Sequence, residues 1–320
     1  MSELRKACDI FDFFLADRTL TEEDYADFLV IIQDVNHPID AAMAVSGLTL
    51  SLIEYQWRKE SFQLLLKAYA VCKEQLVRER IIVGLILAMI KNNAAIRENE
   101  DIWGTIQGVL IDDSELSFTA LCNIARTSQV RQLEKFNQEM AKDIMPLMSQ
   151  PESDEFYNVI RKHQSEMERI TRMALDQNFL IFKSSYHTDF FRESAAHWFL
   201  PWDDNQLLNV GEEHREQVEE LLNKWSMCDS DKYALIGMSG MLLSALKGQF
   251  HGDMLYQIGD QLGNMNIITN GYVQQLYRYF RLSSFSHVNP FELVTYLRDT
   301  WIYRMLVVGE KARKVIGELL

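Results

Sequence analysis

The sequence predicts an all-α fold, an α-solenoid built from antiparallel helix pairs. The main observation is a repeat, because Gly-Leu-Thr-Leu-Ser-Leu-Ile at residues 47–53 returns as Gly-Leu-Ile-Leu-Ala-Met-Ile at residues 84–90. A period of about 35 to 45 residues is typical of helix pairs that bury their apolar faces against neighbouring pairs. Proline is also rare, with five in 320 residues, and no Asn-Gly turn is flanked by the alternating apolar residues of a β-hairpin.

The first two helices are predicted at about residues 4–15 and 21–32. In the first, apolar residues recur at steps of three and four, as they do on one face of a helix. Thr21 is followed by three acidic residues and opens the second helix as an N-cap. Pro38 stands where a first helical residue is favoured, so a third helix is predicted from Pro38 to Tyr55.

This third helix has a shorter companion, and the couple recurs along the chain. The companion at 60–70 resembles a later segment at 98–111, so both members of the pair repeat. Further helices are predicted at 75–91, 115–127 and 131–148. Residues 1–150 are therefore interpreted as one array of helix pairs.

Two glycines occupy equivalent places inside this array. Gly47 and Gly84 both lie in the middle of a predicted helix, where glycine costs about 1 kcal/mol relative to alanine. Such a cost needs a compensating reason. We therefore expect a neighbouring helix to approach closely at both positions.

The chain changes character after residue 150. Residues 151–178 are rich in charge but keep a narrow apolar stripe, which predicts a partly exposed connecting helix. Residues 179–320 form the second predicted region, an aromatic-rich helical domain that continues the array. Eight aromatic residues lie between 179 and 202, where they could form a binding platform or a plug that closes one end of a helical core. We favour the plug.

The last helix of the chain lacks a polar capping unit. It belongs to a series of helices predicted at 212–227, 230–248, 252–263, 269–282, 290–307 and 310–320. A solenoid normally needs a capping unit to shield its terminal face. We therefore expect this face either to form a homodimer or to be covered by further repeats.

Charge and composition limit the partners of the chain. The formal net charge is −14, with 46 acidic and 32 basic residues, and both halves of the chain are acidic. Nucleic acids and anionic membranes are therefore disfavoured, and a protein or peptide is the expected partner. The N-terminus lacks the apolar core of a signal peptide and the four cysteines are widely spaced, so a cytoplasmic protein with reduced thiols is predicted.

Motifs of catalysis and cofactor binding are absent from the sequence. It contains no phosphate-binding glycine loop, no nucleophile elbow and no His-Glu-x-x-His motif, so neither an enzyme nor a cofactor is expected. Glu193 and His197 are four residues apart and Asp203 follows, which leaves an acid/base or metal cluster as an alternative. The segment 229–232 could suggest a calcium loop, but it lacks the required glycine and is interpreted as a helix N-cap.

Five short segments, in order, resemble one protein family. They are Arg-Glu-Arg-Ile-Ile-Val-Gly-Leu at 78–85, Lys-Asp-Ile-Met-Pro at 142–146, His-Trp-Phe-Leu-Pro-Trp at 197–202, Cys-Asp-Ser-Asp-Lys-Tyr at 228–233 and Tyr-Val-Gln-Gln-Leu-Tyr-Arg-Tyr-Phe at 272–280. Together they resemble large bacterial proteins with HEAT-like helix pairs followed by tetratricopeptide repeats. The resemblance implies a cytoplasmic scaffold without established activity, cofactor or catalytic residues. The tetratricopeptide half that the family pattern expects does not follow in this chain.

These observations predict a non-enzymatic scaffold for protein–protein interaction. The inner helices of the array would present a concave surface to a protein or peptide. The candidate contacts are the polar residues that flank the second helices of the pairs, together with Tyr186, Trp198 and Trp202 in the aromatic segment. The alternative is an all-α enzyme or metal-binding protein that uses the aromatic segment as a pocket, with Glu193, His197 and Asp203 as its functional groups.

Overall fold

A computed structural model describes residues 3–149, 153–173, 175–176, 178–202, 227–237 and 267–320, together with residues 215, 219 and 222. These residues are all-helical with no strand among them, as predicted. The first part contains α1 (Glu3–Leu15), α2 (Glu22–Gln33), α3 (Pro38–Glu54), α4 (Lys59–Val71), α5 (Gln75–Lys91), α6 (Asn93–Arg97), η1 (Glu100–Ile102), α7 (Trp103–Asp112), α8 (Ser114–Ser128), α9 (Val130–Ile144), η2 (Met145–Leu147) and α10 (Asp154–Arg172).

The second part is made of shorter elements. They are α11 (Asn178–Ser185), α12 (Asp189–Glu193), η3 (Ala196–Trp198), α14 (Asp229–Gly237), α17 (Ile267–Leu282), η5 (Pro290–Asp299), α18 (Trp301–Leu306) and α19 (Glu310–Leu319). The helix predicted at 290–307 is divided, because the Thr300 side chain accepts a hydrogen bond from the Tyr303 amide and starts α18 as a new helix. All of the predicted helix at 252–263, and most of those at 212–227 and 230–248, lie outside the described residues.

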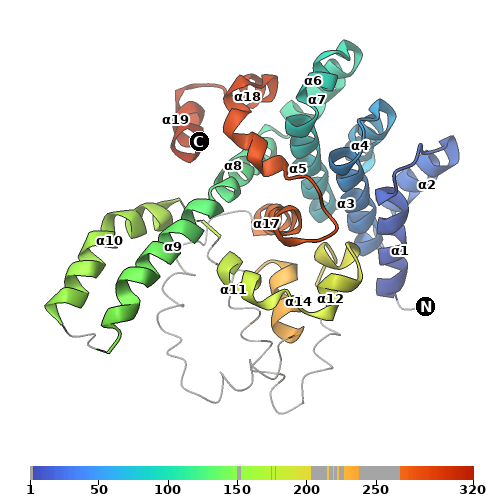
Figure 1. Cartoon of the computed structure of the whole chain (residues 1–320). Helices are drawn as coiled ribbons and strands as arrows, with labels where there is room; N and C mark the ends of the chain where they lie inside the picture. The colour runs from blue at the N-terminus through green and yellow to red at the C-terminus, as the bar shows by residue number, and fades with distance from the viewer. Residues whose placement is uncertain are drawn as a thin grey trace.

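Two rows of helices form the body of the molecule (Figure 1). In one row α1, α3, α5 and α8 pack each against the next, and α19 packs against α8 at the far end. In the other row α2 contacts α4, and α4 contacts α7. No helix in the described part of the chain combines the length and the apolar composition needed to cross a bilayer.

The two glycines do mark close helix contacts. A Cβ atom on Gly47 would lie 2.4 Å from the carbonyl oxygen of Phe11 in α1, and one on Gly84 would lie 2.3 Å from Oγ1 of Thr49 in α3. Each glycine therefore faces the preceding helix of the same row. The prediction of close approach at both positions is confirmed.

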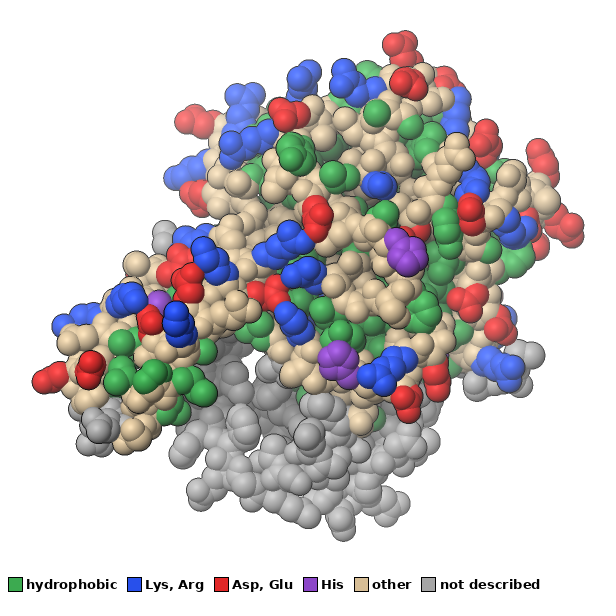
Figure 2. Space-filling view, viewed as in Figure 1, with side chains coloured by type: hydrophobic (Ala, Val, Ile, Leu, Met, Phe, Trp, Pro, Cys, Tyr) green, Lys and Arg blue, Asp and Glu red, His purple; other side chains and the backbone are tan. Residues whose placement is uncertain are grey.

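The α9–α10 hairpin projects from this body. The segment predicted as a connecting helix, 151–178, contains α10, which turns back along α9 (Figure 1). The space-filling view shows the hairpin standing out from the rest of the described surface, with hydrophobic side chains gathered toward its end (Figure 2). Leu133 and Phe136 of α9 form a small separate core with Ile170 of α10.

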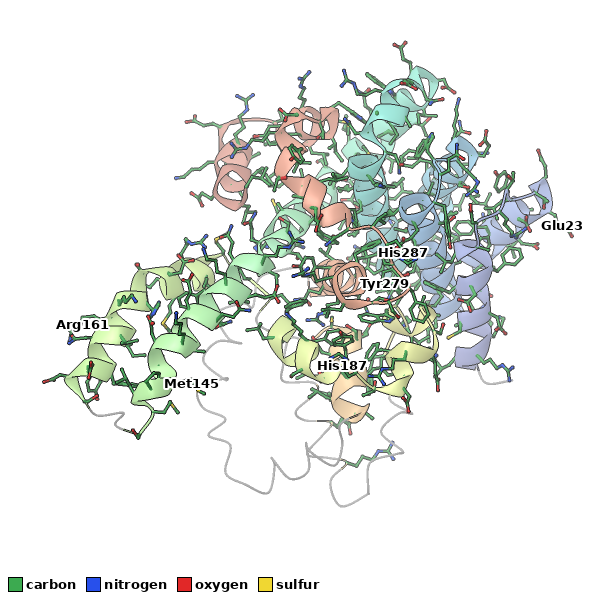
Figure 3. The ribbon with its side chains drawn as sticks, in the orientation of Figure 1. Glu23, Met145, Arg161, His187, Tyr279 and His287 are labelled. Atoms are coloured by element: carbon green, nitrogen blue, oxygen red, sulfur yellow. The ribbon has the colours of Figure 1, made fainter. Side chains whose placement is uncertain are left out.

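The row that contains α3, α5 and α8 is covered by the C-terminal part of the chain. α17 and η5 lie against α5 and α8, and the loop after α17 reaches the end of α3, where the His287 amide lies 3.5 Å from Oε2 of Glu54. Figure 3 shows Tyr279 of α17 and His287 in this central position. The row of α3, α5 and α8 therefore offers no free concave surface in the described part of the array. The predicted contacts beside the second helices of the pairs belong to the other row, α4 and α7, and stay a prediction.

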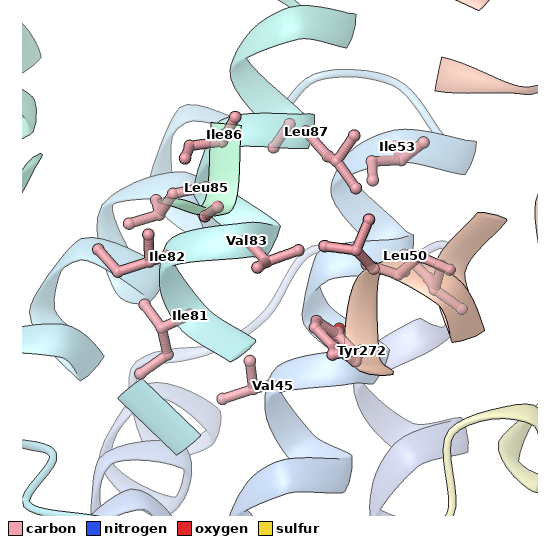
Figure 4. Packing of buried hydrophobic residues seen from close by; sticks show 14 of the residues in the cluster. Val45, Leu50, Ile53, Ile81, Ile82, Val83, Leu85, Ile86, Leu87 and Tyr272 are labelled. Carbon is pink, nitrogen blue, oxygen red and sulfur yellow. The ribbon is translucent and has the colours of Figure 1, made fainter. Parts of the chain in front are cut away.

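The composition of α3 and α5 explains this cover. Both helices are apolar around most of their circumference, and every residue from Asp40 to Ile53 is buried. A helix that is apolar on all sides needs neighbours on all sides. Figure 4 shows Val45 and Leu50 of α3, Val83 of α5 and Tyr272 of α17 in one cluster. The two regions predicted as 1–150 and 179–320 thus share one hydrophobic core.

The N-terminus of α2 provides a local test of helix capping. Oγ1 of Thr21 accepts a hydrogen bond from the Asp24 amide at 3.2 Å, and Oδ2 of Asp24 accepts one from the Thr21 amide at 2.6 Å. Thr21→Ala should therefore lower the free energy of unfolding by about 1 kcal/mol, whereas Thr21→Ser should keep most of it. Urea unfolding followed by circular dichroism measures both, and equal stability of the two variants would contradict the cap.

Candidate functional site

Trp198, one of the three aromatic candidates, lies in the core. Its side chain is 1% exposed, its ring meets those of Phe182 and Tyr279, and its Nε1 donates a hydrogen bond to the Phe191 carbonyl at 3.0 Å. A buried indole with a satisfied N–H is a packing element. Trp198 therefore belongs to the plug and offers no surface to a partner in this conformation.

Tyr186 and Trp202 are partly exposed. Tyr186 stacks on Phe182 with ring centroids 5.9 Å apart, and Trp202 packs edge-on against Tyr233 at 5.0 Å. The Lys232 ammonium lies over the Trp202 ring at 5.8 Å. Each side chain is supported by the core on one side, so both remain candidate contacts.

Glu193 and His197, the alternative acid/base or metal cluster, do not lie on one helix. α12 ends at Glu193 and Ser194 is extended, so the four-residue spacing does not place the two side chains on one helix face. Glu193 is exposed. The His197 ring stacks on Phe190 with centroids 4.3 Å apart, and its Nδ1 lies 2.6 Å from the Phe190 carbonyl oxygen. Asp203 lies outside the described residues, among which no group of three or more His, Cys, Asp and Glu side chains could hold a metal ion.

Sequence reasoning missed a buried charge centre around Arg278 of α17. The Arg278 side chain is 0% exposed, and its Nη2 lies 3.1 and 2.8 Å from the two carboxylate oxygens of Asp176. Its Nη1 lies 2.7 Å from Oδ1 of Asp231 and also contacts Cys228. The guanidinium carbon lies 4.7 Å from the centre of the Phe182 ring. Three distant segments of the chain therefore meet at one cation.

The charges in this centre perturb one another. Burial lowers the pKa of Arg278, but the surrounding carboxylates and Cys228 outweigh it and hold the pKa above the ordinary value. Burial raises the pKa of Asp176, although Arg278 opposes this effect. Burial also raises the pKa of Cys228 well above its ordinary value, so its thiol stays protonated and is a poor nucleophile. The centre is therefore suited to a structural role, in which Arg278 joins α17 to the segments that contain Asp176 and Asp231.

A second buried cation, Arg80 of α5, links other parts of the chain. Its Nη1 donates to Oγ of Ser46 in α3 and to the carbonyl oxygen of Phe199, each at 3.0 Å, and its guanidinium lies over the Tyr272 ring at 4.7 Å. Burial lowers the pKa of Arg80, while Tyr272 and Asp229 oppose the shift. The segment 229–232 does open α14, and Asp231 binds the Cys228 amide at 3.2 Å in the manner of a helix start.

Among the described residues, the α9–α10 hairpin gathers several exposed large apolar side chains. Met145, Met148 and Tyr157 lie near its turn with 72%, 61% and 53% of their surfaces exposed, and Met167 on α10 is also exposed. Large apolar side chains gathered in this way are typical of interaction sites. Figure 3 labels Met145 beside the turn.

Comparisons with known proteins found no match for this chain among family models, curated proteins or solved structures. The resemblance to large bacterial helical-repeat proteins therefore stays a prediction, and function is inferred from the geometry above.

Proposed function

We propose that this chain is a non-enzymatic scaffold for protein–protein interaction, in which stacked helix pairs form a rigid base and the α9–α10 hairpin binds a protein partner. The base would be a HEAT-like α-solenoid, with α1–α2, α3–α4 and the α5–α7 segment as successive units. Gly47 and Gly84 support this proposal, because each lets one unit pack closely on the unit before it.

The observation that carries the proposal is the exposed apolar end of the hairpin. Methionine side chains are flexible and polarizable, so Met145 and Met148 can adapt to the surface of a partner helix or loop. Tyr157 adds an aromatic ring with a polar hydroxyl, a residue type enriched in interface hot spots. The row of α3, α5 and α8, in contrast, is covered by α17 and η5 and offers no comparable surface in the described part of the chain.

The base of the hairpin is held to the body. Glu134 of α9 is buried and binds Lys183 of α11, and its other carboxylate oxygen lies 3.7 Å from Arg281 of α17. Arg131, at the start of α9, pairs with Glu292 of η5. The apolar end is therefore held at a fixed place, so less conformational entropy is lost when a partner binds.

The partner class and the location follow from charge and composition. A net charge of −14 opposes binding to nucleic acids and anionic bilayers, so the partner is a protein or a peptide. We place the interaction in the cytoplasm, where the four cysteines of the chain would stay reduced.

Site-specific photocrosslinking tests this proposal. Met148 is replaced by a photocrosslinking amino acid in the cells that naturally make the protein. Ile111 of α7 serves as the matched control, since it is 60% exposed and Met148 is 61% exposed. We expect one reproducible protein adduct at Met148 that is several-fold weaker at Ile111, because the hairpin gathers its apolar side chains whereas Ile111 lies on the body.

A substitution completes the test. Met145→Ser combined with Tyr157→Ser should abolish the Met148 adduct while leaving the helical content unchanged, because it removes the apolar contacts and no core residue. Equal adducts at Met148 and Ile111, or an adduct that survives the double substitution, would reject the hairpin as the binding site.

A further inference from the structure

We propose that copies of this chain associate end to end, with the acidic α1–α2 end of one copy against the basic α18–α19 end of the next. This inference concerns a second surface and does not depend on the hairpin. It follows from charge and exposed apolar residues at the two ends of the helix row.

The two surfaces lie at opposite ends of the molecule. The row runs from α1 through α3, α5 and α8 to α19, and α18 contacts α7 and α8 beside it. Figure 1 shows α1 and α2 on one side of the body and α18 and α19 on the other. A contact between these ends joins different surfaces of two copies, and so it can repeat.

The first end carries excess negative charge. Residues 1–40 contain 10 acidic and 3 basic residues. Two of the bases are already neutralised, because Lys6 pairs with Asp40 and Arg18 pairs with Asp24. Glu22, Glu23 and Asp27 of α2 are exposed and form no ion pair with any described residue.

The other end carries excess positive charge. Residues 301–320 contain four bases and two acids. The bases are exposed and none of them is in an ion pair within the described part of the chain: they are Arg304, Lys311, Arg313 and Lys314. Lysine and arginine side chains gather over the α18–α19 region in Figure 2, and acidic side chains predominate beside α1 and α2.

Both ends also expose apolar side chains. Val30 of α2 is 65% exposed and Phe13 of α1 is 43% exposed. At the opposite end Val308 is 71% exposed, and Tyr296 of η5 is 65% exposed. The apolar stripe of α19 itself is covered, because Ile316 and Leu319 are buried against the body. The surface left for a second copy is therefore basic with apolar residues beside it, which complements the α1–α2 end.

Analytical ultracentrifugation of the 320-residue chain tests the proposal. Charged pairs at the edge of an interface are screened by salt, so association should be concentration-dependent at about 0.02 M salt and at least tenfold weaker at about 0.5 M. Two charge-reversed variants are compared: Glu23→Lys with Asp27→Lys, and Lys311→Glu with Lys314→Glu. Each alone should weaken self-association at least tenfold at low salt, because the substituted side chains then face exposed side chains of the same sign on the other end.

Mixing the variants gives the decisive result. An equal mixture should recover association to within about threefold of the unmodified chain, because the unmodified basic end of the first variant can bind the unmodified acidic end of the second. Lys142→Glu with Arg161→Glu on the exposed surface of the α9–α10 hairpin is the control and should have no effect. The proposal is overturned by a chain that stays monomeric at about 100 μM in low salt, by a mixture that does not recover, or by an equal loss in the control.

Discussion

Replacement of Arg278 by methionine is expected to lower the free energy of unfolding by about 3–5 kcal/mol. Methionine fills much of the same volume, so the loss would come from the charge and its hydrogen bonds. Asp176 and Asp231 would be left as buried carboxylates without their cation; their exposed fractions are 7% and 5%. An uncompensated buried charge costs more than the lost ion pair contributed.

Neutralising the carboxylates separates this effect from packing. Arg278→Met combined with Asp176→Asn and Asp231→Asn should regain about half of the lost stability, because the remaining amides are uncharged. Arg278→Lys should still lose about 2 kcal/mol, since a single ammonium nitrogen cannot reproduce the contacts that Nη2 makes with Asp176 and Nη1 makes with Asp231. Urea unfolding monitored by circular dichroism gives all three values. A triple variant less stable than Arg278→Met would show that the carboxylates are not strained by the missing cation.

The repeat made much of the N-terminal fold predictable. Gly47 and Gly84 are costly inside helices, and this cost predicted close helix contacts that the structure confirms. The acidic run after Thr21 likewise predicted the start of α2, because an N-cap needs only residues within one turn. Such features are local in sequence, so one chain suffices to find them.

The packing of α17 over α3 and α5 was not predicted, although the sequence contained a signal for it. An inner helix of an open array should have one polar face, and α3 and α5 have none. Periodicity located these helices but did not identify what covers them. That cover comes from α17, which begins at Ile267, far along the chain from α3 and α5.

The buried charge centres were missed because their partners are distant in sequence. Arg278 and Asp176 are 102 residues apart, and Arg80 and Phe199 are 119 apart. No spacing rule joins such residues. The available signal was weaker: Arg80 precedes a continuous apolar run and Arg278 lies among aromatic residues, and long charged side chains in such surroundings are buried only when they are paired.

The segments that suggested a family meet inside this protein. Those at 78–85, 197–202, 228–233 and 272–280 contribute Arg80, Phe199, Asp231 and Arg278 to the two buried centres. Their unusual composition is therefore explained by packing, because each supplies a charge, a carbonyl oxygen or an aromatic face to the interior. The segment at 142–146 is different, since it forms the exposed end of the hairpin.

Gly47→Ala is expected to lower the free energy of unfolding by about 2–3 kcal/mol, although alanine favours helices. The added methyl group would meet the Phe11 carbonyl oxygen at 2.4 Å and the Leu15 amide nitrogen at 3.2 Å. These are backbone atoms, so α1 as a whole must move away from α3. Gly84→Ala should cost about 1 kcal/mol, because its methyl group meets the Thr49 side chain, which can rotate.

Gly108 of α7 supplies the matched control, since a Cβ atom there has no neighbour within 4 Å. Gly108→Ala should raise the free energy of unfolding by up to about 1 kcal/mol through helix propensity alone. The order of stability in urea should therefore be Gly108→Ala, the unmodified chain, Gly84→Ala and Gly47→Ala. If Gly47→Ala proved as stable as Gly108→Ala, α1 would not pack closely on α3. The proposed stacking of successive helix pairs would then lose its strongest support, because that contact is the one in which backbone directly meets backbone.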